Sequence, residues 1–216
     1  MHIPYMDCKE AIDHLLEVDP RFNHLIKIHG PPKLQRTRNS FKSLVQIVIN
    51  QQLSGKAAAS IYNRFVDLFP ANRFPTPNKV RQLSISQIQT AGLSLQKATT
   101  IHELAEQYIQ GQISQHKFRR MDPDEITEIL INVKGIGDWT ASIFLMFALN
   151  HPDILPVGDL GIRKGIQKLC GFDKLPNAKT MLQIAEPWTP FRTTASWYLW
   201  RLLETKPKQT DAYDTD

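Results

Sequence analysis

Residues 133–141 read Val-Lys-Gly-Ile-Gly-Asp-Trp-Thr-Ala, and after an apolar stretch residues 156–164 read Pro-Val-Gly-Asp-Leu-Gly-Ile-Arg-Lys. Gly135 and Gly137 bracket a single residue, so we expect a tight turn there that exposes backbone N–H groups. A helix that begins near Asp138 would add the positive end of its dipole, and such a terminus attracts anions. The segment therefore predicts a hairpin that holds an anion, with an aspartate a short distance downstream.

Composition excludes several classes of protein. The chain has 216 residues, which is enough for one sizeable core or two small lobes. No apolar run is long enough to span a bilayer, and the first residues lack the layout of a signal peptide. Cys8 and Cys170 are the only cysteines, so a disulfide framework or a four-cysteine metal site is not possible. We expect an intracellular protein with no membrane association.

The charge of the chain permits a polyanionic partner without requiring one. The formal net charge is +5 at pH 7, and many proteins of this charge never bind nucleic acid. The seven histidines form no His-x-x-x-His pattern or other cluster of ligands, so no zinc site is predicted.

Almost every segment with a hydrophobic pattern favours a helix, and no convincing period-two strand is present. Asn39, Ser54, Ser94 and the Asp122–Glu125 pair are placed to begin helices. Two apolar stripes are expected to be buried, Phe41, Leu44, Val45, Val48 and Leu53 in the first and Ala57, Ala58, Ile61 and Phe65 in the second. The expected helices lie at about 7–18, 40–53, 54–69, 84–91, 94–110, 122–133, 139–149, 160–169, 178–186 and 190–203. The fold class is all-α.

Residues 134–141, followed by Gly158-Asp159, resemble the helix-hairpin-helix and Gly/Pro-Asp signature of base-excision DNA glycosylases. Three further segments resemble the alkylation-repair branch, the 3-methyladenine DNA glycosylase II family. They are Gln51-Gln52-Leu53-Ser54 with Ala57-Ala58, Ala91-Gly92-Leu93-Ser94, and Pro190-Phe191-Arg192 leading into Trp197-Tyr198-Leu199-Trp200-Arg201. The resemblance covers about residues 38–203.

This resemblance implies one helix-hairpin-helix glycosylase domain over residues 1–205, built from two helical lobes with a cleft between them. Lobe A would comprise about residues 38–148, and lobe B about residues 1–37 together with 149–205. We expect the polar tail at 206–216 to be disordered.

The resemblance also implies an activity, the removal of alkylated purines of the 3-methyladenine type from double-stranded DNA. The damaged nucleotide would rotate out of the duplex, and hydrolysis of its N-glycosidic bond would leave an abasic site. Asp159 matches the essential aspartate of the family, which would stabilise the oxocarbenium-like sugar and orient the attacking water. The other interpretation of Asp159 is a helix N-cap, and the two roles are compatible.

Three residues are candidates for a base pocket. Trp139 stands where relatives with lyase activity carry a lysine, and an indole cannot form a Schiff base, so no lyase activity is expected. Its ring suits a cationic base, although core packing is an alternative. Ile143 departs from the aromatic residue that relatives often carry there. Trp200, or less readily Trp197, would supply another wall, unless both only pack between helices.

The remaining candidates concern DNA and a cation. Leu95 matches the apolar wedge that relatives push into the duplex, with a hydrophobic staple as the alternative. Lys56 and Arg163 are candidates for phosphate contacts, or are simply solvated charges. The hairpin that binds DNA would comprise Val133, Lys134, Gly135, Ile136, Gly137 and Thr140. No cofactor is expected to be required. The resemblance implies a Na⁺ or K⁺ ion at the hairpin, because the carbonyls of Ile131, Val133 and Ile136 correspond to those that often bind such an ion in family members.

A second hypothesis keeps the DNA-binding machinery and drops the catalysis. A protein that binds lesions or abasic sites, with weak or no base excision, would fit the aliphatic Ile143 and the Gly55-Lys56 insertion. Either hypothesis implies damaged duplex DNA as the partner and a monomer as the working form. Either also places the protein with genomic DNA, which means the nucleus in a eukaryote.

Overall fold

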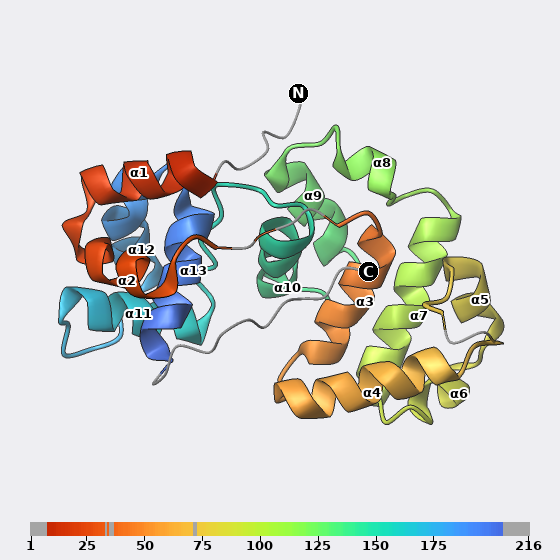
Figure 1. The fold of residues 1–216 in the computed structure, drawn as a ribbon. Coiled ribbons are helices and arrows are strands. Elements are labelled where there is room, and N and C mark those ends of the chain that lie inside the picture. The colour runs from red at the N-terminus through yellow and green to blue at the C-terminus, as the bar shows by residue number, and fades with distance from the viewer. Residues whose placement is uncertain (1–7, 33, 35–36, 71–72, 205–216) are drawn as a thin grey trace. The chain divides into compact units, whose positions relative to one another are not determined.

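The structure, a computed structural model, describes residues 8–32, 34, 37–70 and 73–204. These residues form helices and connecting loops without any strand, which confirms the predicted all-α class (Figure 1). Two compact units share the chain. The first contains Thr37–Phe144, and the second joins the segment before Thr37 to the residues from Leu145 onward. Within the described ranges, no helix has both the length and the apolar character needed to cross a membrane.

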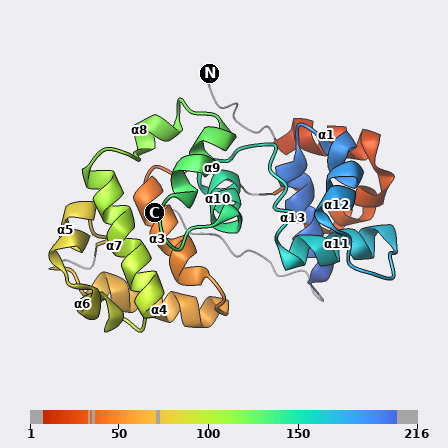
Figure 2. The same cartoon turned by 180° about the vertical axis from the view of Figure 1, so that it is seen from behind.

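The first unit is organised around its longest helix, α7, which packs against α3, α5 and α6. In both views α7 lies between α3 and α5 (Figure 1 and Figure 2). A second contact joins α9 to α10, the two helices that flank the glycine-containing turn. The helices of this unit are α3 (Ser40–Asn50), α4 (Gly55–Asp67), α5 (Pro77–Gln82), α6 (Ile85–Gln89), α7 (Leu95–Ile109), α8 (Gln115–Phe118), α9 (Pro123–Ile131) and α10 (Asp138–Ile143).

Most helix starts in this unit lie where capping residues predict them. The Asn39 side chain accepts a hydrogen bond from the N–H of Lys42, and α3 begins at the next residue. Asp122 and Glu125 form a complete capping box at α9. These bonds join residues three apart, so the signal for them is local. The short helices α5 and α8 were missed because six and four residues carry no clear period.

The end of α3 differs from the prediction. The helix stops at Asn50, Gln52 takes a left-handed conformation with φ of 55°, and Leu53 is 39 % exposed instead of buried in the stripe. Ala57 is exposed as well, while Ala58 is buried. A lysine from α7, described below, binds carbonyls at the point where α3 stops.

The helix expected at residues 139–149 is also altered. Regular α10 ends at Ile143, and residues Phe144–Ala148 form a π-helical turn, η3. Asn150 ends it with φ of 55°, and the N–H of His151 donates to the Leu145 carbonyl at 2.9 Å. The stretch is largely buried as predicted, but Trp139 is only half-buried.

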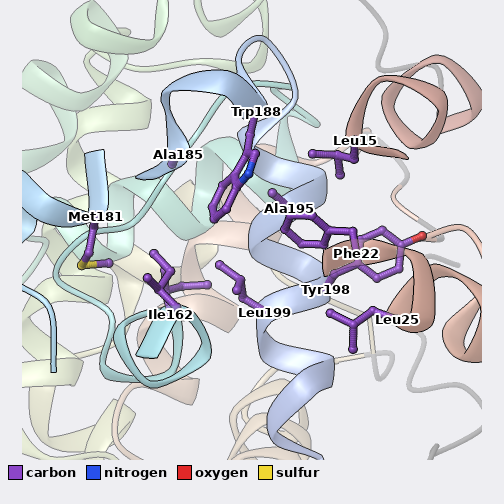
Figure 3. Packing of buried hydrophobic residues seen from close by; sticks show 11 residues of the cluster. Leu15, Phe22, Leu25, Ile162, Met181, Ala185, Trp188, Ala195, Tyr198 and Leu199 are labelled. Carbon is purple, nitrogen blue, oxygen red and sulfur yellow. The ribbon is translucent and has the colours of Figure 1, made fainter. Parts of the chain in front are cut away.

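The second unit is organised around α13, which packs against α1, α2 and α11. Figure 3 shows its core, where Trp188, Phe22 and Tyr198 lie together with aliphatic side chains such as Ile162 and Leu199. Helix α2, which has seven residues, was not predicted from the sequence. The elements are α1 (Cys8–Val18), η1 (Pro20–Phe22), α2 (Asn23–His29), α11 (Leu160–Cys170), α12 (Ala178–Ala185), η4 (Glu186–Trp188) and α13 (Arg192–Leu203).

A buried carboxylate ties the N-terminal segment to this core. Asp19 accepts hydrogen bonds from Arg21 Nε at 2.7 Å, from Arg21 Nη2 at 2.6 Å and from the Trp188 indole at 2.9 Å. Burial raises the pKa of Asp19, but the bonds from Arg21 and Trp188 and the charge of Arg21 outweigh it, so the pKa lies below the usual 3.8.

We expect this carboxylate to give the protein an acid-sensitive stability. Because the folded pKa of Asp19 is lowered, its contribution is complete above about pH 5 and is lost as the pH falls through the folded pKa. Urea unfolding of wild type and Asp19→Asn between pH 5 and pH 2 measures this contribution. The difference between their free energies of unfolding should become smaller as the pH is lowered. Asp13→Asn, at an exposed aspartate of α1, is the control. A difference that stays constant over this range would contradict the assignment.

Candidate functional site

The hairpin connects α9 to α10 through residues 132–137. Val133 N–H donates to the Leu130 carbonyl, and Ile136 N–H donates to the Val133 carbonyl, both at 3.0 Å. Val133 and Ile136 are buried and anchor the turn, while Lys134 is exposed. Gly135 takes φ of +92°, as its predicted role requires.

The second glycine has a different role from the predicted one. Gly137 takes φ of −116°, a conformation open to any residue, so the turn itself does not require glycine there. A Cβ atom at Gly137 would meet open space. Within the described residues, no side chain caps α10, because Gly137 is its N-cap. The first N–H groups of α10 therefore have no side-chain cap, and they carry the partial positive charge of a helix start.

Two polar side chains that sequence reasoning left without a role hold the hairpin. Gln51 Nε2 donates to Thr140 Oγ1 at 2.9 Å and to the Gly135 carbonyl at 3.3 Å. Thr100 Oγ1, from α7, donates to the Lys134 carbonyl at 2.8 Å. Gln51 lies in a segment that carries the family resemblance, but neither residue has a local pattern that points to the hairpin.

Two leucines of the first unit are exposed, one at the start of α7 and one in the loop after α3. Leu95 is the first residue of α7 and is 62 % exposed, and Ser94 caps that helix by accepting from the Lys97 N–H. Leu53 follows the left-handed Gln52. Lys56 is exposed in the first turn of α4. These positions are open to a partner, and the roles of Leu95 and Lys56 in DNA contact stay predictions.

In the second unit, Asp159 is the N-cap of α11. Its Oδ1 accepts a hydrogen bond from the Ile162 N–H at 2.8 Å, so the capping interpretation is confirmed. The same oxygen accepts from Trp200 Nε1 at 3.0 Å. The half-buried carboxylate is thus oriented by two donors and lies at the positive end of α11.

Trp200 reaches Asp159 because Gly161 leaves room for its ring. A Cβ atom at Gly161 would lie 2.8 Å from Trp200 Cδ1 and 2.9 Å from Asp159 Oδ1. The indole also stacks on Phe147, with ring centroids 5.7 Å apart and an interplanar angle of 29°. Trp200 was predicted as a pocket wall, and its direct bond to the carboxylate was not foreseen. Trp197 packs elsewhere, under the guanidinium of Arg201 at 4.7 Å.

The other predicted site residues have ordinary packing environments. Trp139 is half-buried on α10, and Ile143 is buried on the same helix. Arg163 Nε donates to the Pro176 carbonyl at 3.2 Å, so part of its guanidinium serves the second unit itself. Among the described residues, no group of three His, Cys, Asp or Glu side chains is placed to hold a metal ion.

Comparison with known proteins is consistent with these elements. Residues 45–190 match the family model of the HhH-GPD superfamily base excision DNA repair proteins. The chain is 35 % identical to DNA-3-methyladenine glycosylase 1 of Schizosaccharomyces pombe over 87 % of this chain and 84 % of that protein. It is 30 % identical to the alkylbase DNA glycosidase-like protein mag2 of the same organism, over 91 % of this chain and 94 % of mag2.

A solved structure is similar as well. The S. pombe 3-methyladenine DNA glycosylase Mag1 in complex with abasic DNA has a TM-score of 0.80 and 34 % identity to this chain, and the match covers 89 % of this chain and 95 % of that one.

Proposed function

We propose that this chain, which belongs to the HhH-GPD superfamily of base excision DNA repair proteins, is a monofunctional glycosylase that removes alkylated purines from DNA. The observation that carries the proposal is the carboxylate of Asp159, held by the Ile162 N–H and the Trp200 indole at the start of α11. The similarity to DNA-3-methyladenine glycosylase 1 supports the choice of substrate class.

The chemistry needs one well-placed carboxylate. An alkylated purine is cationic, so it departs with the electrons of the C1′–N bond as a neutral base and needs no separate acid. Asp159 stabilises the positive charge that develops on the sugar, and it accepts a proton from the water that attacks C1′. Trp139 carries no amine for a Schiff base, so the product is an intact abasic site.

DNA binding falls to the hairpin and to basic side chains of both units. The uncapped N–H groups at the start of α10 bind a phosphate, and Lys56 and Arg163 add contacts to the backbone. Of the residues predicted to line the base pocket, Trp200 is the one that binds the Asp159 carboxylate. Because the substrate is genomic DNA, we expect the protein inside the cell, and in the nucleus if the organism is a eukaryote. We propose a monomer as the working form.

We also propose that the hairpin holds a monovalent cation. The Val133 carbonyl accepts only the Ile136 N–H among the backbone bonds of the turn, which leaves its second lone pair for an ion. With the carbonyls of Ile131 and Ile136, it would hold Na⁺ or K⁺ and place a positive charge beside the bound phosphate. The Lys134 carbonyl accepts a hydrogen bond from Thr100, so we do not count it among the ligands of the ion.

One assay tests the activity. Purified protein is incubated with methylated duplex DNA, and the freed bases are separated by chromatography. We expect 3-methyladenine in the released fraction, with no strand cleavage. A wild-type protein that binds abasic DNA tightly and releases no base would support the second candidate, a protein that binds lesions or abasic sites. The buried aliphatic Ile143 is the observation that favours that candidate.

The wedge assignment leads to a further prediction. Because Leu95 is exposed, Leu95→Ala should leave the melting temperature unchanged but lower kcat/KM by about tenfold, through lost stabilisation of the gap in the duplex. Leu53→Ala provides the comparison, since Leu53 is the other exposed leucine of this unit. Leu182→Ala, at a leucine of α12 that is 47 % exposed, is the control and should behave as wild type. If Leu53→Ala lowers kcat/KM more than Leu95→Ala does, the wedge is Leu53, in the loop after α3.

A further inference from the structure

Lys97 on α7 binds the C-terminal end of helix α3. Its Nζ donates to the Ile49 carbonyl at 2.8 Å and to the Gln51 carbonyl at 2.7 Å. Burial lowers the pKa of Lys97, so the fold carries a desolvation cost to keep an ammonium here. The two carbonyls lie at the negative end of α3 and offset that cost. Gln51 is thereby held by its backbone at the point where the chain leaves the helix.

The side chain of Gln51 passes this constraint on to the hairpin. Its amide donates to Thr140 Oγ1 and to the Gly135 carbonyl. A carbonyl oxygen can only accept, so the nitrogen of the Gln51 amide must face the hairpin. Lys97 on α7 thus holds the backbone of Gln51, and the side-chain amide of the same residue binds both the turn and α10.

A second connection runs directly from α7. Thr100 lies one helical turn after Lys97, and its hydroxyl donates to the Lys134 carbonyl. A Cβ atom at Gly135 would overlap that hydroxyl, so the absence of a side chain at Gly135 is what lets α7 approach the turn. The same helix carries Leu95 at its first position. The hairpin and the exposed leucine are thus attached to one helix.

We infer that Lys97 and Gln51 are positioning residues, which hold the hairpin against α7 so that the phosphate-binding turn and Leu95 meet DNA as one preformed surface. The part of this inference that concerns DNA binding rests on the proposed function. Neither residue needs to contact DNA or the reacting base for this role. A preformed surface binds more tightly because no ordering of the turn is required at the moment of binding.

The test uses the full chain with Lys97→Met and Gln51→Met, which keep most of the side-chain length and remove the donors. Three quantities are measured for each: the Kd for an abasic duplex, the single-turnover excision rate at saturating protein, and hydrogen exchange of residues 131–141 without DNA. We expect Kd to rise by about tenfold, the saturated rate to stay within about twofold, and exchange in the hairpin to accelerate. Unchanged Kd and unchanged hairpin exchange in both variants would overturn the inference.

The matched control is Lys168→Met. Lys168 Nζ also donates to a carbonyl at the end of a helix, that of Leu202 at 2.9 Å, but it lies in the second unit. This variant should leave Kd and hairpin exchange at wild-type values, and an equal effect from it would also count against a specific role for Lys97. If wild type binds no DNA, the proposed function fails, while hydrogen exchange still reports whether Lys97 and Gln51 order the hairpin.

Discussion

Asp159→Asn should lower the single-turnover rate of base excision by about 10³-fold, which is the scale found when an electrostatic group is removed from a reaction centre. The substitution is close to isosteric. The asparagine Oδ1 can still accept from the Ile162 N–H and the Trp200 indole, so the cap of α11 is kept. The negative charge is lost while these two bonds are kept, so the melting temperature and the affinity for abasic DNA should stay near wild type.

Asparagine is the informative choice at this position. Asp159→Ala would also remove the cap, at about 1 kcal/mol of stability, and would confuse folding with chemistry. Trp200→Phe supplies the complementary control, because it keeps an aromatic ring against Phe147 and removes the N–H that orients the carboxylate. We expect it to slow excision by about tenfold, the scale of one hydrogen bond to a charged group. Full excision by Asp159→Asn would remove this carboxylate from the mechanism.

Replacing the two hairpin glycines by alanine should affect different properties, stability at Gly135 and DNA affinity at Gly137. Gly135→Ala should destabilise the protein by about 1–3 kcal/mol from its left-handed backbone alone, with a further loss where the new methyl group overlaps the Thr100 hydroxyl. Urea unfolding monitored by circular dichroism measures this effect. A Gly135→Ala protein as stable as wild type would show that α7 does not approach the turn as closely as described.

Gly137→Ala should leave folding intact, because φ of −116° suits alanine and a Cβ atom there meets open space. It should raise the Kd for an abasic duplex by about tenfold, since the methyl group stands beside the N–H groups that receive the phosphate. Fluorescence anisotropy on a labelled duplex measures the change. Wild-type affinity in Gly137→Ala would mean that DNA is held elsewhere.

Local signals in the sequence were reliable for helix starts. Ser94, the Asp122–Glu125 pair and Asp159 all cap helices where expected. Each cap joins residues three apart, so four consecutive residues are enough to predict it. The end of α3 was predicted wrongly, and the burial of Leu53 with it. The chain turns at the left-handed Gln52, and the carbonyls there are bound by Lys97, which is distant in sequence.

The all-α class, the membership in a repair family, the hairpin segment and the candidate carboxylate could be read from the order of residues. They depend on short spacings that persist whatever surrounds them. The bond from Trp200 to Asp159, the grip of Gln51 and Thr100 on the hairpin, and the different needs for Gly135 and Gly137 emerged only from the folded chain. Each of these depends on close approach between segments far apart in sequence, or on a backbone angle that such an approach imposes, and no local pattern records either.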